Sequence, residues 1–214
     1  MSIVEDARKG IITEEMKVVA AQEGVTEDFI RRGIASGQIV IPVSPYRKVK
    51  LCGIGGGLRT KVNCSVGTST DIVDVDMEVE KVKAGERAGA DTIMELSTGG
   101  DFVEIRRRCI EATTLSVGSV PLYQAFIEAA RKDGAVIHMR EDDLFRITEE
   151  QAKLGTNFMA IHTGVNRITL ERLQRQGRHG GLCSRGGAFL TAWMLHNDKE
   201  NPLYAEFDYL CEIL

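Results

Sequence analysis

From Lys61 onward, short apolar runs alternate with longer helical patterns, and this alternation restricts the possible folds more than any other feature of the sequence. It indicates βα units whose strands form a parallel sheet. We therefore predict an α/β fold with about five βα units. The predicted strands are Lys61–Val66, Thr92–Leu96, Ser116–Pro121, Phe158–His162 and Gly181–Ser184. The predicted helices are Asp76–Ala88, Asp101–Ala112, Tyr123–Lys132, Glu141–Leu154, Thr169–Gln176, Ala188–Leu195 and Tyr204–Ile213.

Residues 1–57 follow a different pattern and are predicted to form a small N-terminal cap. Two helical patterns, Ile12–Gln22 and Thr26–Ser36, each begin near a threonine that is suited to cap a helix. A short predicted strand, Gln38–Pro42, follows, and the glycines of segment 53–57 indicate a loop-rich connection. We place the boundary after residue 57 and assign residues 58–214 to the larger α/β domain.

Length and composition restrict the class of protein. The 214 residues are 43% hydrophobic and carry 27 basic against 31 acidic side chains, a net charge of −4 that argues against broad nucleic-acid binding. No apolar run approaches the length of a membrane span, and the N-terminus lacks a secretory signal, so we expect a cytoplasmic protein. The five cysteines are widely spaced without a CxxC pair, so we expect reduced thiols and no metal site in this chain.

Two parallel architectures fit this length. A complete (β/α)8 barrel needs at least about 200 residues, and residues 1–57 are already assigned to the cap. A five-stranded open sheet and an incomplete (β/α)8 barrel both agree with the alternation. No dinucleotide-binding fingerprint follows the first predicted strand, because Gly53-Ile-Gly55 precedes a strand instead.

Functional residues of parallel βα folds lie at the carboxyl ends of the strands. Asn63 and Ser65 alternate with apolar neighbours in the first predicted strand, where they either face a ligand or form a polar interior layer. Met94 lies near the end of the second strand, a position that is also typical of core methionines. Tyr123 follows the third strand, and Ser97–Asp101 combines small residues with a helix start that suits an anion.

The last two predicted strand ends have the strongest ligand-binding pattern. His162 ends an apolar run shortly before a glycine, which favours a site over a core position. Ser184, Arg185 and Gly186 open a helix, where backbone N–H groups and a guanidinium suit a phosphate or carboxylate. Together the strand ends predict a small, polar, phosphorylated ligand. They contain no lysine, carboxylate pair or metal triad that would assign a catalytic role.

Long segments between Ala7 and Leu214 resemble the phosphomethylpyrimidine synthase family and its relative, 5-hydroxybenzimidazole synthase. They read ARKGIITEEM, FIRRGIASGQIVIP, GLRTKVN, GADTIMELSTGGD, VGSVPLYQA, EEQAKLG, IHTGV, SRGGAFLTAWMLHN and KENPLYAEFD. The resemblance implies a radical S-adenosylmethionine (SAM) lyase on a (β/α)8 barrel that rearranges 5-aminoimidazole ribotide. It also implies a homodimer and, as cofactors, a 4Fe-4S cluster, SAM and zinc whose ligands lie beyond Leu214. By this resemblance the chain is the first part of a barrel and is expected to be inactive alone.

The same resemblance implies which residues contact the substrate, and where the sequence departs from the family pattern. The implied contact residues are Asn63, Met94, Tyr123, His162, Ser184, Arg185 and Gly186. The family's NANIG, IHAG and GIVSRGG motifs read NCSVG, IHTG and GLCSRGG here, which introduces Cys64, Ser65, Thr163 and Cys183. Because these changes lie at strand ends, we predict the 5-hydroxybenzimidazole product, the lower ligand of cobamides. The alternatives are the hydroxymethylpyrimidine phosphate of thiamin synthesis and a non-catalytic ribotide-binding or dimerisation fragment.

Overall fold

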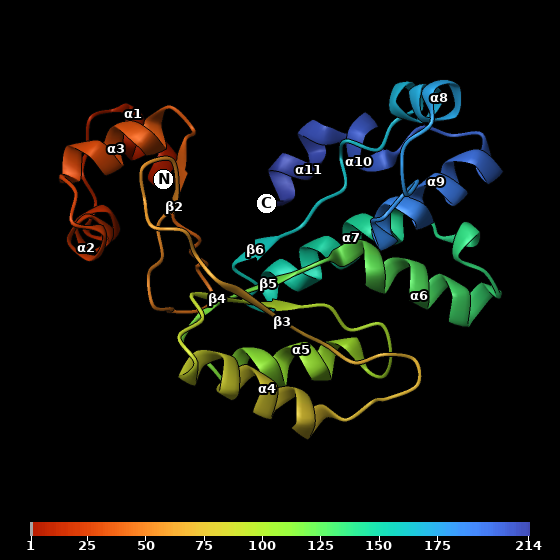
Figure 1. Cartoon of the computed structure of the whole chain (residues 1–214), viewed down its shortest axis with the longest axis horizontal. Coiled ribbons are helices and arrows are strands. Elements are labelled where there is room, and N and C mark those ends of the chain that lie inside the picture. Colours follow the sequence, from red (N-terminus) through yellow and green to blue (C-terminus); the bar gives the residue numbers. More distant parts are fainter. Residues whose placement is uncertain (1) are drawn as a thin grey trace.

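The structure, a computed structural model that describes residues 2–214, begins with a small helical unit beside a larger α/β part (Figure 1). The Ser2 and Thr26 side chains cap helices of this unit by accepting hydrogen bonds from backbone N–H groups. The unit has a hydrophobic core of its own, which includes Met16, Ile30 and Ile34. The predicted division into a cap and a larger domain, with its boundary after residue 57, stays a prediction. Its elements are α1 (Ile3–Arg8), α2 (Glu14–Glu23), α3 (Glu27–Ala35) and the antiparallel pair β1 (Ile39–Val40) and β2 (Ile54–Gly55).

The glycine-rich segment 53–57 differs from the prediction because part of it is a strand. Ile54–Gly55 pairs with β1 instead of forming only loop. A Cβ on Gly55, where φ is +153°, would lie 2.1 Å from the Gln38 carbonyl oxygen, so this close pairing requires glycine. Helix α1 is a second element that the sequence pattern does not predict.

Four parallel strands form the sheet of the larger part, and they pair in chain order, β3-β4-β5-β6. The parallel, sequential arrangement confirms the predicted α/β class. Closure into a barrel stays a prediction. The strands are β3 (Asn63–Val66), β4 (Thr92–Glu95), β5 (Ser116–Ser119) and β6 (Phe158–Met159).

The two faces of this sheet have different surroundings. Ile93 and Val117 point toward α4 (Val75–Arg87) and α5 (Phe102–Glu111) and share a buried cluster with side chains of both helices. The opposite face carries one row of residues that crosses all four strands, and this row is the one that leads to the candidate site. Its members are Ser65, Met94, Gly118 and Phe158.

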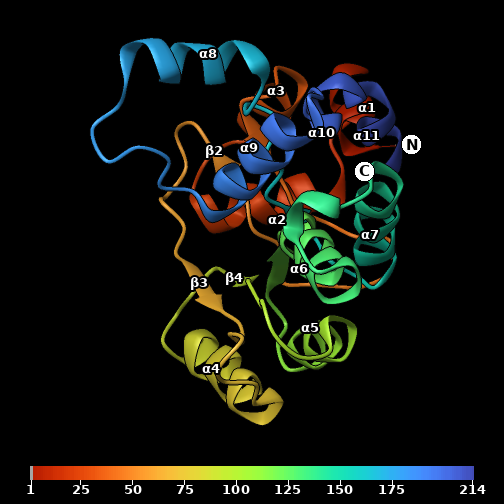
Figure 2. The same cartoon turned by 90° about the vertical axis from the view of Figure 1, so that its right-hand side faces the viewer.

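The remaining helices build the largest hydrophobic core, beyond the open face of the sheet. Helix α9 packs on η1 and α6, and α11 packs on α7. Helix α8 projects from the rest of the molecule in Figure 2, and Leu170 is its buried residue. No helix within residues 2–214 combines the length and apolar character that a bilayer span requires. The helices are α6 (Pro121–Asp133), the 3-10 helix η1 (Val136–His138), α7 (Glu141–Lys153), α8 (Arg167–Gln176), α9 (Arg185–Asn197), α10 (Pro202–Ala205) and α11 (Phe207–Ile213).

The prediction of a fifth strand at Gly181–Ser184 is wrong, because this segment is a loop outside the sheet. Gly180 and Gly181 have φ values of +77° and +58°. This left-handed conformation interrupts an extended run, and the chain enters α9 directly from the loop.

Candidate substrate-binding site

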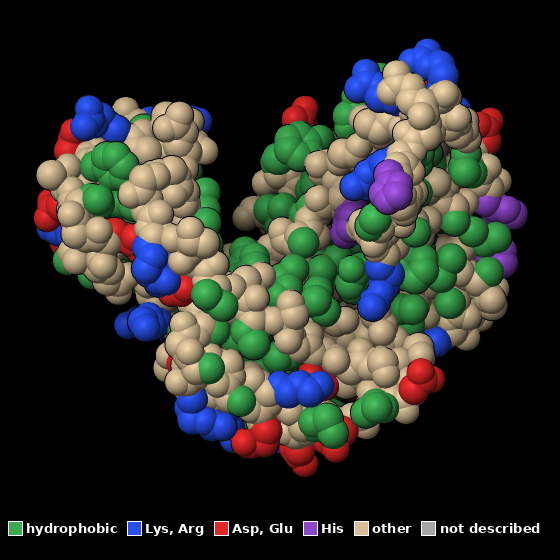
Figure 3. All heavy atoms as spheres, viewed as in Figure 1, with side chains coloured by type: hydrophobic (Ala, Val, Ile, Leu, Met, Phe, Trp, Pro, Cys, Tyr) green, Lys and Arg blue, Asp and Glu red, His purple; other side chains and the backbone are tan. Residues whose placement is uncertain are grey.

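An open pocket of about 480 Å³ lies at the carboxyl ends of β3 and β4. The deep hollow in Figure 3, between the N-terminal unit and the helical part that carries α8 and α9, is separate from this pocket, whose lining includes no residue of the N-terminal unit. The loop after β3 forms one wall of the pocket, and side chains from α4, α6 and α9 complete it. The lining residues are Ser65, Val66, Gly67, Thr68, Ser69, Lys81, Leu96, Thr98, Tyr123 and Arg185.

Five of the predicted site residues meet at this pocket or directly behind it. His162 Nε2 lies 3.3 Å from Ser184 Oγ, and the rings of His162 and Tyr123 have centroids 6.5 Å apart. The Arg185 Cζ atom lies 5.3 Å from the centroid of the Tyr123 ring, a cation–π distance. A Cβ on Gly186 would lie 2.4 Å from His162 Nε2, so the imidazole occupies the space that a side chain would need. Three segments, from α6, the β6 exit and α9, therefore converge on one cluster.

The His162 side chain is half-buried and is neutral at neutral pH. Burial lowers the pKa of His162 below its ordinary value of about 6.5. Its Nδ1 atom is buried and has no hydrogen-bond partner within residues 2–214. A buried, unpaired ring nitrogen retains the capacity to donate to or accept from a ligand, according to its tautomer.

Arg185 is an exposed cation at the start of a 13-residue helix, α9. Ser184 caps this helix by accepting a hydrogen bond of 3.1 Å from the Gly187 N–H. In the described part of the chain, no carboxylate pairs with the Arg185 guanidinium. An unpaired guanidinium beside the positive end of a helix dipole is suited to bind a phosphate or carboxylate.

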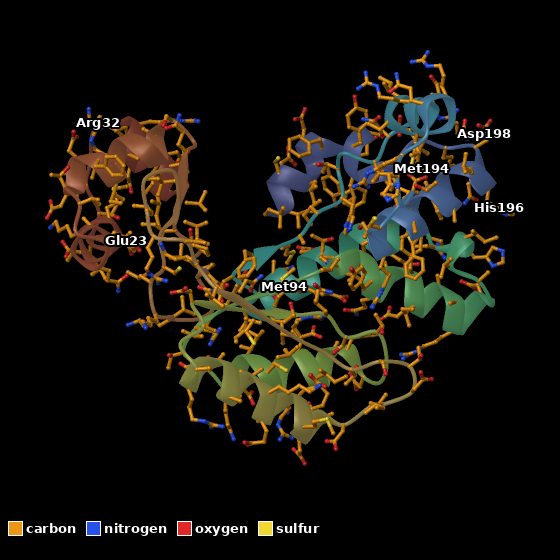
Figure 4. All side chains as sticks on the ribbon, in the orientation of Figure 1. Glu23, Arg32, Met94, Met194, His196 and Asp198 are labelled. Carbon is orange, nitrogen blue, oxygen red and sulfur yellow. The ribbon has the colours of Figure 1, made fainter. Side chains whose placement is uncertain are left out.

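Met94 and Asn63 lie apart from this cluster. Met94 is 8% exposed and packs in the largest core with Leu122, near the middle of the sheet in Figure 4. Asn63 begins β3, and its Oδ1 accepts a 2.9 Å hydrogen bond from the Thr92 hydroxyl. Ser65, two residues further along the same face, is the β3 residue that lines the pocket. The contact roles of Asn63 and Met94 stay predictions.

The loop after β3 is held by residues that the sequence pattern does not single out. Glu78 is 2% exposed, and its carboxylate accepts 2.6 Å hydrogen bonds from the Gly67 N–H and the Lys81 ammonium. The Thr68 N–H donates to Ser97 Oγ at 3.0 Å, which ties this loop to the one after β4. Because acidic residues flank Glu78 in the sequence, it resembles one of several exposed charges, and its burial could not be predicted.

The cysteines of the described residues do not fit a 4Fe-4S cluster. Cys52 and Cys109 are buried, and burial raises the pKa of both thiols, that of Cys109 to about 12. Cys64 faces α4, where its Sγ lies 2.8 Å from the position of a Cβ on Gly85. Residues 2–214 contain no group of three or more His, Cys, Asp or Glu side chains arranged to hold a metal ion.

Comparison with known proteins identifies the family. Residues 2–214 match the family described as "Radical SAM ThiC family". Among curated proteins, the chain is similar to the phosphomethylpyrimidine synthases of Methanoculleus marisnigri (81% identical) and Methanoregula boonei (78%), and to phosphomethylpyrimidine synthase 1 of Methanothermobacter thermautotrophicus (59%). Each alignment includes 214 residues, all of this chain, so the chain spans about half the length of these relatives. The chain belongs to the radical SAM ThiC family.

Proposed function

We propose that this chain carries a substrate-binding part of a phosphomethylpyrimidine synthase and that its ligand is 5-aminoimidazole ribotide. One observation carries the proposal: relatives that are 74–81% identical over all 214 residues bear that enzyme's name. The structure supports a ligand of this size and charge, because a phenol and an unpaired guanidinium line one open pocket and an uncharged imidazole lies next to the phenol.

Each group of the cluster has a separate role in this proposal. Arg185, with the Ser184-capped start of α9, binds the phosphate of the ribotide through charge-assisted hydrogen bonds. His162 and Tyr123 contact the uncharged ring end of the ligand, where a neutral imidazole avoids repulsion of the amino-substituted heterocycle. Gly186 serves the site by leaving room for the His162 ring.

The pyrimidine product is favoured over 5-hydroxybenzimidazole, and the prediction drawn from the strand-end departures has no support in the comparisons. Relatives that are 72–81% identical are named for the pyrimidine reaction. The positions of two departures agree with this assignment. Cys64 faces α4 rather than the open face of the sheet, and Cys183 is exposed, with its Sγ 3.6 Å from the Gly180 carbonyl oxygen.

The complete enzyme of this proposal includes parts that this chain does not supply. The four parallel strands are the first strands of an eight-stranded barrel, which a further C-terminal half completes. When bound, the 4Fe-4S cluster and SAM provide the radical that starts the rearrangement, and zinc is the third implied cofactor. Their ligands, the cytoplasmic location and the homodimer are expectations from the family resemblance.

A chimera tests this function directly. Residues 1–214 of this chain replace the corresponding 214 residues of the Methanoculleus relative, which is 81% identical over that segment. The reconstituted chimera receives SAM and the ribotide under anaerobic conditions, and mass spectrometry identifies the product. We expect the hydroxymethylpyrimidine phosphate at a rate near that of the parent relative. Formation of 5-hydroxybenzimidazole would assign the other branch, and ribotide binding without turnover would favour the non-catalytic alternative.

A further inference from the structure

We propose that Asn201 is a positioning residue for His162, because its side-chain amide holds the turn after β6 from which the His162 ring enters the candidate site. Asn201 lies just before α10 and is fully buried, at 0% exposure. Its Nδ2 donates hydrogen bonds of 2.7 Å to the His162 carbonyl and 2.8 Å to the Val165 carbonyl. One amide group therefore holds both ends of the turn.

The amide reinforces a turn at residues 163–164 that its own backbone closes only weakly. The backbone hydrogen bonds of residues 2–214 include none from the Val165 N–H to the His162 carbonyl. The Glu200 carboxylate adds a second tie, since it accepts from the Asn201 N–H at 2.8 Å and from the Arg167 N–H at 3.2 Å. The segment before α10 thus reinforces the turn with contacts from 36 and 39 residues away in the sequence.

The His162 residue is held from two sides. Asn201 fixes its backbone carbonyl, while the ring packs on Gly186 and lies 3.3 Å from Ser184 Oγ. Without the amide, two partly buried carbonyl groups lose their partners, and such groups recover hydrogen bonds by moving toward water. We expect this movement to withdraw the His162 ring from α9 and from Tyr123.

Asn201 also has an ordinary structural role, which the test must separate from positioning. Its Oδ1 accepts a 3.0 Å hydrogen bond from the Leu203 N–H and so caps α10. Aspartate retains this acceptor and is as good a helix cap as asparagine. It lacks the amide donor, however, and places negative charge against two carbonyl oxygens. Asn201→Asp therefore removes the hold on the turn while preserving the cap.

The matched control is Asn197→Ala. Asn197 also donates from Nδ2 to two carbonyl groups, those of Ile137 and Trp193, at 3.0 and 2.9 Å. These carbonyls belong to η1 and α9 rather than to the turn after β6. A general loss of stability through a broken asparagine amide would affect both variants, whereas positioning of His162 would be lost only in Asn201→Asp.

The readout is the titration of the four histidines by NMR in the 214-residue chain labelled at the imidazole carbons. We expect His162 to titrate below about 6.5 in the unmodified chain and in Asn197→Ala, and near the ordinary histidine pKa in Asn201→Asp. His179 serves as the internal control and should not change, whereas Asn197→Ala removes a hydrogen bond next to His138 and His196. If folded Asn201→Asp retains the unmodified His162 titration, or if Asn197→Ala shifts it equally, the positioning role is refuted. Asn201→Ser keeps a cap acceptor and adds no charge, so it must shift the His162 titration in the same direction, because the new carboxylate of Asn201→Asp by itself raises the pKa of a nearby imidazole.

The inference rests on the proposed function only where it treats His162 as a substrate residue. In the chimera, Asn201→Asp should weaken ribotide affinity about tenfold, while Asn197→Ala should leave it unchanged. Failure of the unmodified chimera to bind ribotide would refute the proposed function and leave the NMR result intact. Normal binding with an unchanged His162 titration in Asn201→Asp would refute the positioning role alone.

Discussion

The absence of a side chain at Gly186 makes room for the His162 ring. The distance of 2.4 Å between His162 Nε2 and a Cβ built on Gly186 is too short for any side chain, so Gly186→Ala must displace the ring. We expect this variant to weaken ribotide binding by the chimera at least about tenfold, as measured by calorimetry. Gly164→Ala is the control in the neighbouring turn, because a Cβ on Gly164 would meet no atom within 4 Å. Equal affinities for both variants would show that the ring position does not matter for binding.

Arg185 provides the second test at this scale, because its guanidinium has no carboxylate partner within residues 2–214. Loss of a charge-assisted hydrogen bond to the phosphate should cost about 1.5–3 kcal/mol of binding free energy. Arg185→Ala should therefore weaken ribotide binding by the chimera, whereas Arg172→Ala, an exposed arginine on α8, should not. Calorimetry with the ribotide and with its dephosphorylated riboside checks the assignment. Equal losses for both ligands would place Arg185 away from the phosphate.

The elements around the sheet are joined by a buried ion pair that the sequence does not reveal. Arg106 of α5 and Glu95 of β4 are 4% and 1% exposed, with Nε and Oε2 3.1 Å apart. Arg106→Met leaves the Glu95 carboxylate buried without its cation and should lower the free energy of unfolding by about 3–5 kcal/mol. Arg107→Met, on the same helix but in exposed pairs, should change it by less than about 1 kcal/mol. Urea unfolding of both variants measures the difference, and similar values would contradict the structural role of the buried pair.

Strand and helix patterns predicted most elements of the α/β part because burial on the sheet requires continuous apolar runs. The predicted runs Thr92–Leu96 and Ser116–Pro121 contain all of β4 and β5. The strand prediction for Gly181–Ser184 was wrong because the length and composition of this segment are typical of a strand. Its glycines, however, adopt a left-handed backbone conformation that a strand does not allow. The short α10 could not be predicted, since its start depends on the Asn201 cap and on contacts with a distant turn.

The sequence predicted those site residues whose side chains can bind a polar ligand and that lie at the end of a predicted strand. His162 and Arg185 satisfy this condition, and the structure brings both into one cluster with Tyr123. Asn63 and Ser65 point to the same face of β3, so the alternation of residues does not show which of them lines the pocket. In the structure the pocket begins at Ser65. Asn201 could not be predicted in this way. It donates to backbone carbonyl groups, which every residue has, so the sequence does not indicate its partners.

Across the whole molecule, the N-terminal unit is attached to the sheet by charged groups. Lys61, just before β3, forms a 2.7 Å ion pair with Glu23 of α2, and both side chains are 7% exposed. The Glu23 carboxylate also accepts a 2.8 Å hydrogen bond from the Arg59 N–H, and the Arg59 guanidinium pairs with Asp91 just before β4. These contacts join the unit to the amino ends of the first two strands. The candidate site lies at the opposite, carboxyl ends, so the N-terminal unit does not cover it.

The two outer strands of the sheet provide the last prediction. Within residues 2–214, β3 and β6 each pair with one neighbour, so this sheet has two edges. Ser65 on the open face is exposed, whereas Met94 on the same face is buried in the largest core. An unpaired edge carries backbone N–H groups that exchange readily with solvent. If a C-terminal half completes the barrel, it must pair with these edges. We therefore expect amides in residues 63–66 and 158–159 to exchange more slowly in the chimera than in the 214-residue chain. Mass spectrometry after deuterium labelling measures this exchange.

The central strands β4 and β5 are the internal control, because they already have two neighbours each and should exchange alike in both proteins. Equal exchange at the outer strands would mean that the second half leaves them unpaired, and the barrel would have to be abandoned in favour of an open sheet.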